Sequence, residues 1–139
     1  MLIKNTKQLN NMLLEIDKKA RHQTAIQVHD KLQDILVEYF YNNYKPNHYK
    51  RTYQLIDRSP KIDEYDEFET IVGMYSDGIN YEDDAASVIN LAMQGYHGAT
   101  SIVGSQHYEV WNIFLEWCNE NVIKIYKQNL DDIAKGLQF

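Results

Sequence analysis

The chain has 139 residues, of which 44% are hydrophobic and 24% charged, and a formal net charge of −6. This length suits one domain with a modest core, and the composition argues against wholesale disorder. The apolar runs are a few residues long, far short of the roughly 20 that span a bilayer, so we expect no membrane segment. The single cysteine, Cys118, excludes an intrachain disulfide, fits folding in a reducing cytoplasm, and is expected to be a buried small hydrophobe.

Charge is distributed unevenly between the two parts of the chain. Residues 1–60 carry ten Lys and Arg against six Asp and Glu, a balance of +4, whereas residues 61–139 carry four against fourteen, a balance of −10. The basic part of one copy would therefore attract the acidic part of the next. The alternative is that both sets of charges are solvated and have no partner. No dense stripe of Lys and Arg is present, so we expect no sequence-specific binding of nucleic acid.

Apolar residues from Leu9 to Phe40 repeat at a spacing of three and four, which predicts one long helix over residues 6–44. Thr6 is the candidate N-cap, and no Pro or Gly occurs before Pro46 to interrupt the helix. The face opposite the apolar residues carries three basic side chains that we expect at a subunit interface: Lys18, Lys19 and Arg21.

A β-hairpin is predicted over residues 50–76. Its expected strands are 51–57 (RTYQLID) and 67–75 (EFETIVGMY), because both show partial alternation and a β-rich composition. Between them, residues 58–66 contain Ser59, Pro60 and acidic residues, which is typical of an exposed turn. Gly73 is a candidate bulge. We interpret the acidic cluster around 61–69 as a solvated charge run without a role in catalysis.

The second part of the chain predicts a short helix over 84–94, a glycine-rich loop (QGYHGATSIVG, 94–104), and a C-terminal helix over 105–135 ended by Gly136. Trp111 and Trp117 are separated by about 600° of helical rotation, so one should fill the core and the other meet a partner. The order of elements predicts a single α+β domain, 1–139, with a small antiparallel sheet. A loop this rich in glycine favours contact with another surface.

Five histidines raise the question of a metal site. His97 and His107, with Asp83 or Asp84 upstream, would offer suitable ligands for zinc or manganese. No HExxH, CxxC or His-x-His pattern supports this site, so we favour His97 as a residue that fixes the loop. His22 and His29 are seven residues apart and would share one face of the first helix, but neither has a second ligand four residues away.

Three segments in order carry a resemblance to a known family. They are YKRTYQL (49–55) after the long helix, Ile71 to Asp77 followed by Tyr81, and Gly95-Tyr96-His97-Gly98 before the aromatic helix that begins near Trp111. This order resembles the small neck proteins of tailed bacteriophages, the head–tail joining or tail-completion family. In that family a Y-x-R-T-x-x-L segment starts the sheet, and an H-G loop precedes the last helix.

The resemblance implies a structural protein of the virion, made in the cytoplasm of the host bacterium. Such proteins form a homo-oligomeric ring between the portal and the tail tube, contact other neck and tail proteins, bind no cofactor and catalyse nothing. By this resemblance, Arg51 and Thr52 would anchor the entrance to the sheet, and His97 and Gly98 would shape a loop that faces a neighbouring subunit. Trp117 completes the predicted interface.

Two other hypotheses stay open. One is a small metal-dependent enzyme that uses His97, His107 and Asp84. The other is a helical regulatory module that binds another protein through its long first helix.

Overall fold

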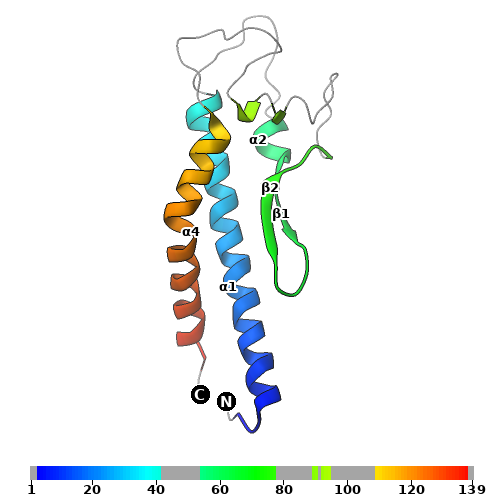
Figure 1. Cartoon of the computed structure of the whole chain (residues 1–139), viewed down its shortest axis with the longest axis vertical. Helices are drawn as coiled ribbons and strands as arrows, with labels where there is room; N and C mark the ends of the chain where they lie inside the picture. The colour runs from blue at the N-terminus through cyan, green and yellow to red at the C-terminus, as the bar shows by residue number, and fades with distance from the viewer. Residues whose placement is uncertain (1–2, 42–53, 78–88, 91, 95–108, 138–139) are drawn as a thin grey trace, which may run out of the picture.

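The computed structural model describes residues 3–41, 54–77, 89–90, 92–94 and 109–137. It confirms the predicted α+β class. The elements, in chain order, are α1 (Thr6–Ile35), the π-helical η1 (Leu36–Tyr41), α2 (Gln54–Arg58), β1 (Pro60–Glu64), β2 (Thr70–Met74) and α4 (Val110–Lys135). Helix α1 is central, with α4 along one side and the β1–β2 hairpin along the other (Figure 1). Because α1 begins and α4 ends at the same end of the molecule, the two long helices are antiparallel.

The N-cap of helix α1 lies one residue before its predicted position. The side chain of Asn5, not Thr6, accepts a hydrogen bond from the backbone N–H of Gln8 at 2.9 Å. The side chain of Gln8 in turn accepts from the backbone N–H of Lys4 at 2.7 Å. This reciprocal pair satisfies two backbone donors at the helix start, as a capping box does. The predicted helix 6–44 is confirmed through Tyr41, its last turns being π-helical; residues 42–44 lie outside the described part.

The first predicted strand, 51–57, is wrong where the structure describes it. Residues Gln54–Arg58 form helix α2, and the sheet begins only at Pro60. The two strands pair antiparallel from Pro60↔Met74 to Glu64↔Thr70, so the turn is at 65–69 rather than 58–66. Proline has no N–H for the ladder and is tolerated at the first position of a strand, which explains why the sheet starts there. The second strand, β2, lies within the predicted range 67–75.

Gly73 is not a bulge, because it pairs in regular register with Lys61. Its place in the strand has a steric reason instead: a Cβ atom there would lie 3.3 Å from the ring of Tyr75. Beside it, Ser59 closes the open end of the hairpin. The backbone N–H of Tyr75 donates to the Ser59 carbonyl, and the Ser59 hydroxyl donates to the Tyr75 carbonyl, both at 2.9 Å.

The described part of the C-terminal half agrees with the predicted helices. Helix α4 begins at Val110 after Glu109 and ends at Lys135, with Gly136 following it as predicted. The expected first turn of this helix, 105–108, lies outside the described residues. A short helix was predicted over 84–94. Residues 89–90 and 92–93 are helical and Gln94 forms a turn, whereas 84–88 and 91 lie outside the described residues.

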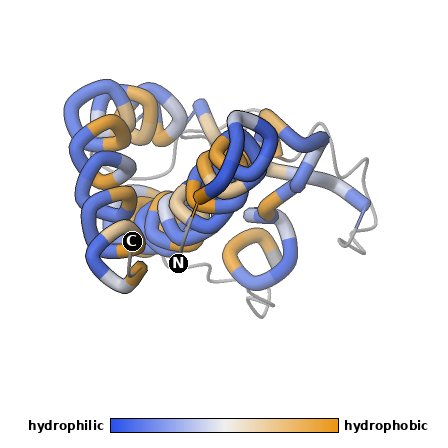
Figure 2. The backbone as a smooth tube through the Cα atoms, turned by 90° about the horizontal axis from the view of Figure 1, so that it is seen from below, coloured by the Kyte–Doolittle hydropathy of each residue, from blue (hydrophilic) through white to orange (hydrophobic). Residues whose placement is uncertain are grey.

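The hydrophobic core lies at the end of the molecule where η1, α2, the segment 89–93 and the start of α4 meet the end of α1. Its buried members come from all five of these segments: Val28, Leu32, Ile35, Leu36, Leu55, Ile89, Ala92, Met93, Val110 and Phe114. Viewed from the opposite end, α4 and the hairpin again lie on either side of α1 (Figure 2). The core therefore fixes α1, α4 and the hairpin at one end of the molecule. Farther along α1, hydrogen bonds of Arg21 and Tyr126 join the same elements.

Replacing Leu32 with alanine should lower the free energy of unfolding by about 2–5 kcal/mol, because Leu32 is fully buried and its removal leaves a cavity in the core. Urea titration followed by circular dichroism would measure the loss. The matched control is Leu13→Ala on the same helix, where the side chain is 52% exposed and the change should stay within about 0.5 kcal/mol. Equal losses in the two variants would contradict this placement of the core.

Candidate interaction surface

Arg21 joins helix α1 to the hairpin. Its Nε donates to Asp17 Oδ2 at 2.9 Å, its Nη1 donates to the Thr70 hydroxyl at 3.0 Å, and its Nη2 donates to the Glu67 carbonyl. The side chain is only 14% exposed, so these bonds are partly shielded from water. One of the three residues predicted to form a basic interface is therefore used within the subunit.

The network extends from Arg21 in two directions. Toward the hairpin, the Thr70 hydroxyl donates to Glu64 Oε2 at 2.8 Å, and His22 Nδ1 lies 2.9 Å from Glu64 Oε1. Toward α4, the Tyr126 hydroxyl donates to Asp17 Oδ1. Through these contacts one continuous set of hydrogen bonds connects α1, the hairpin and α4.

The same contacts change the acidity of two groups. The hydrogen bond from His22, followed by that from Thr70, lowers the pKa of Glu64 below its ordinary value. Burial, followed by the hydrogen bond to Asp17, raises the pKa of Tyr126 to about 12. Both shifts favour the form present near neutral pH, an ionised Glu64 and a neutral Tyr126, so the network is fully formed there.

The other two predicted basic residues, Lys18 and Lys19, are exposed. They line a groove of about 520 Å³ between α1 and the hairpin, whose opposite wall carries three acidic residues: Glu64, Asp66 and Glu67. Lys19 also pairs with Glu15 on its own helix at 3.4 Å, an exposed contact of small energetic value. The basic side chains thus face an acidic wall of the same subunit.

A second groove, of about 330 Å³, is mainly apolar and runs between α4 and β2 over α1. Its lining comes from all three elements and includes Ala25 and Val28 of α1, Val72 of β2, and Leu115, Cys118 and Val122 of α4. The polar members of the groove are Arg21, Thr24, Thr70 and Tyr126. Cys118, expected to be buried, is half-buried, and burial raises the pKa of its thiol. This keeps the thiol protonated and supports its role as a small apolar side chain.

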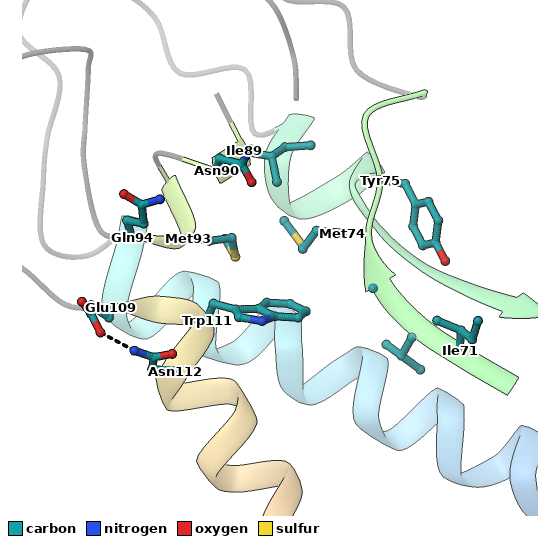
Figure 3. Close-up of a pocket in the computed structure, with 12 residues that line it drawn as sticks. Ile71, Met74, Tyr75, Ile89, Asn90, Met93, Gln94, Glu109, Trp111 and Asn112 are labelled. Atoms are coloured by element: carbon teal, nitrogen blue, oxygen red, sulfur yellow. Dashed lines mark hydrogen bonds between the residues drawn. The ribbon is translucent and has the colours of Figure 1, made fainter. Parts of the chain in front are cut away.

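A third and larger pocket, of about 640 Å³, lies between β2, the segment 89–94 and the start of α4 (Figure 3). Met74, Met93 and Trp111 form an apolar interior, while Gln94 and Glu109 lie where the two described segments stop. Gln94 and Glu109, the described residues on either side of 95–108, therefore both line this pocket. Asn112 donates a hydrogen bond to the Glu109 carboxylate at its edge.

Both tryptophans of α4 are half-buried and pack against the core cluster. The Trp111 and Phe114 ring centroids are 5.2 Å apart, and Lys31 Nζ lies 5.8 Å from the centroid of Trp117. Trp117, predicted to meet a partner, therefore has contacts within the subunit that already cover part of its ring.

Several predicted site residues lie outside the described part of the chain. These are Arg51, Thr52, His97 and Gly98 of the interface, and Asp83, Asp84 and His107 of the metal hypothesis. Among the residues that are described, no three His, Cys, Asp or Glu side chains come together as metal ligands. The predicted common face of His22 and His29 is confirmed: both contact the hairpin, His29 through an Nε2 that donates to the Pro60 carbonyl at 3.0 Å.

The exposed aromatic residues of the hairpin turn were not predicted from the sequence. Phe68 is 73% exposed and Tyr65 is 65% exposed, within the acidic segment that we interpreted as solvated. The turn is ordered by Asp66, whose side chain accepts from the backbone N–H of Phe68 at 2.7 Å and whose own N–H donates to the Glu69 carbonyl. The signal was present in the sequence as two aromatic residues among five acidic ones.

Comparisons of the chain with protein-family models, with curated proteins and with solved structures find no match. Within the described residues, neither long helix has an apolar stretch that would cross a bilayer.

Substituting Arg21 with methionine should lower the free energy of unfolding by about 2 kcal/mol, because three partly shielded hydrogen bonds are lost while the aliphatic stem is retained. Chemical denaturation would measure this loss. Lys18→Met is the matched control, since it removes the same kind of charge from an exposed position one turn earlier. A loss as small as that of the control would show that Arg21 does not hold the hairpin.

Glu64 should contribute to the pH dependence of stability. Its pKa is lowered on folding, so its contribution is complete above the ordinary value of 4.5 and is lost as the pH falls through the folded-state pKa. Between about pH 6 and about pH 3, the melting temperature of the wild type should therefore fall more steeply than that of Glu64→Gln. Glu69→Gln removes an equal charge without breaking these hydrogen bonds and should retain the wild-type slope; identical slopes in all three proteins would contradict the assignment.

Proposed function

We propose that this protein acts by assembly, as a structural subunit of the head–tail connector of a tailed bacteriophage, in a ring between the portal-side neck proteins and the tail tube. The observation that carries the proposal is the apolar surface outside the core. Tyr65 and Phe68, both on the hairpin turn, are 65% and 73% exposed. Large apolar side chains grouped on an ordered turn are typical of protein contacts.

The resemblance to the neck proteins supplies the particular assembly. One part of it changes with the structure: Leu55, the last residue of the Y-x-R-T-x-x-L segment, lies in α2 and belongs to the buried core, and the sheet begins afterwards at Pro60. The segment therefore leads into the sheet through a helical turn. The order of long helix, small sheet and final helix is as the resemblance implies.

The charge distribution supports contacts between unlike surfaces of neighbouring copies. A ring requires such heterologous contacts, in which one patch of a subunit meets a different patch of the next. Since Arg21 is engaged within the chain, Lys18 and Lys19 are the members of the predicted basic patch that stay exposed.

One observation favours the alternative of a module that binds another protein through its first helix. Leu9 and Leu13 are 38% and 52% exposed on the same side of α1. They lie in the first turns of the helix, which extend beyond the end of α4 (Figure 1).

Quantitative mass spectrometry of gradient-purified particles from the source lysate tests the proposal. The protein should be present at a ring-like ratio to the portal protein, because each connector contains one ring. The portal and major capsid proteins provide the internal standards. Absence from intact particles, together with recovery of one stable cytoplasmic partner, would overturn the connector role in favour of the binding module.

A further inference from the structure

The hairpin turn is an exposed, ordered and strongly acidic surface with two aromatic side chains. Residues 63–69 carry five carboxylates and no basic group. Glu64 is held by His22 and Thr70, and Asp66 caps the turn. The side chains of Asp63, Glu67 and Glu69 have no hydrogen-bond or ion-pair partner among the described residues. A partner of this surface must therefore combine apolar area with positive charge.

The first turns of α1 have this combination. Residues 3–14 carry Lys4 and Lys7 and no carboxylate, and they expose Leu9 and Leu13. The start of α1 extends beyond both the hairpin turn and the end of α4 (Figure 1), and Leu9 and Leu13 are exposed there although Met12 is buried. Neither lysine side chain has a carboxylate partner in the described part of the chain.

We propose that the hairpin turn of one copy binds the N-terminal end of α1 of the next copy. Tyr65 and Phe68 would cover Leu9 and Leu13, and the carboxylates of Glu67 and Glu69 would lie near Lys4 and Lys7. Since the two surfaces are different parts of the subunit, the contact is heterologous and repeats from copy to copy. This inference rests on the proposed assembly function and names its contact surfaces.

The charge pairing can be tested by exchange. The variant E67K/E69K places two lysines on the turn at the positions proposed to face Lys4 and Lys7, and K4E/K7E makes the end of α1 acidic. Each variant alone places like charges at every contact and should associate at least tenfold more weakly than the wild type. An equimolar mixture restores opposite charges at both kinds of contact. The lysines introduced on the turn of one variant meet the glutamates introduced on the helix of the other, and the unchanged turn and helix end form the wild-type pair. Association of the mixture should therefore return to near the wild-type level.

Sedimentation velocity at low salt, over a series of protein concentrations, would measure association. E116K/E120K is the matched control: it changes the net charge as E67K/E69K does, but on the exposed side of α4, and should leave association unchanged. A wild-type protein that stays monomeric at its highest soluble concentration would overturn the proposal. So would two weakened variants whose mixture is not restored, or a control that weakens association equally.

The apolar half of the contact needs a separate variant. Phe68→Ala should weaken association about tenfold while leaving the melting temperature of the monomer unchanged, because its ring is 73% exposed. Ile123→Ala removes a similarly exposed side chain from α4 and should have no effect. Equal effects of the two substitutions would contradict the assignment. These measurements use purified protein and are independent of the particle experiment. If association does not follow these predictions but the protein is found in particles, this contact is wrong and the connector role stands.

Discussion

The arrangement of α1, the hairpin and α4 depends on the hydrogen bonds that the guanidinium group of Arg21 donates. It binds Asp17 on its own helix, the Thr70 hydroxyl on β2 and the Glu67 carbonyl in the turn. Because Asp17 also accepts from Tyr126, the same cluster reaches α4. A hairpin with five carboxylates near its turn lies more favourably against a helix that offers a cation, and Arg21 supplies a partly buried one whose planar geometry satisfies several acceptors at once.

The two ends of the molecule are held together by different physical means. At one end, side chains from η1, α2, the segment 89–93 and the start of α4 bury an apolar core, which stabilises without strong directional preference. Toward the other end, α1 and α4 are joined by polar contacts. Asn129 donates to the Thr24 hydroxyl and to Gln27, at 3.0 Å and 2.8 Å. Directional bonds of this kind fix the register of two helices while leaving much of their surface accessible for binding.

These features support the proposed role in assembly. The polar network holds the hairpin along α1, and this position presents Tyr65 and Phe68 on an ordered turn. The apolar groove lies between α4 and β2, and the pocket of Figure 3 lies between β2, the segment 89–94 and the start of α4. Charged residues on the turn and at the start of α1 have opposite signs, which favours a repeating contact between different surfaces of successive copies.

The α+β class and the two long helices could be predicted from the sequence alone, because apolar residues that recur three and four positions apart over many turns indicate an amphipathic helix. The sequence did not place the first strand. Residues 54–57 have the alternation of a strand, yet the burial of Leu55 in the core makes them part of α2. Nor did it separate Arg21 from Lys18 and Lys19, since the three share a charge and a stretch of helix. The difference between Arg21 and the two lysines follows from the fold. Whether a charged side chain is bound within the chain depends on its partners, and for Arg21 two of these lie more than forty residues away in the sequence.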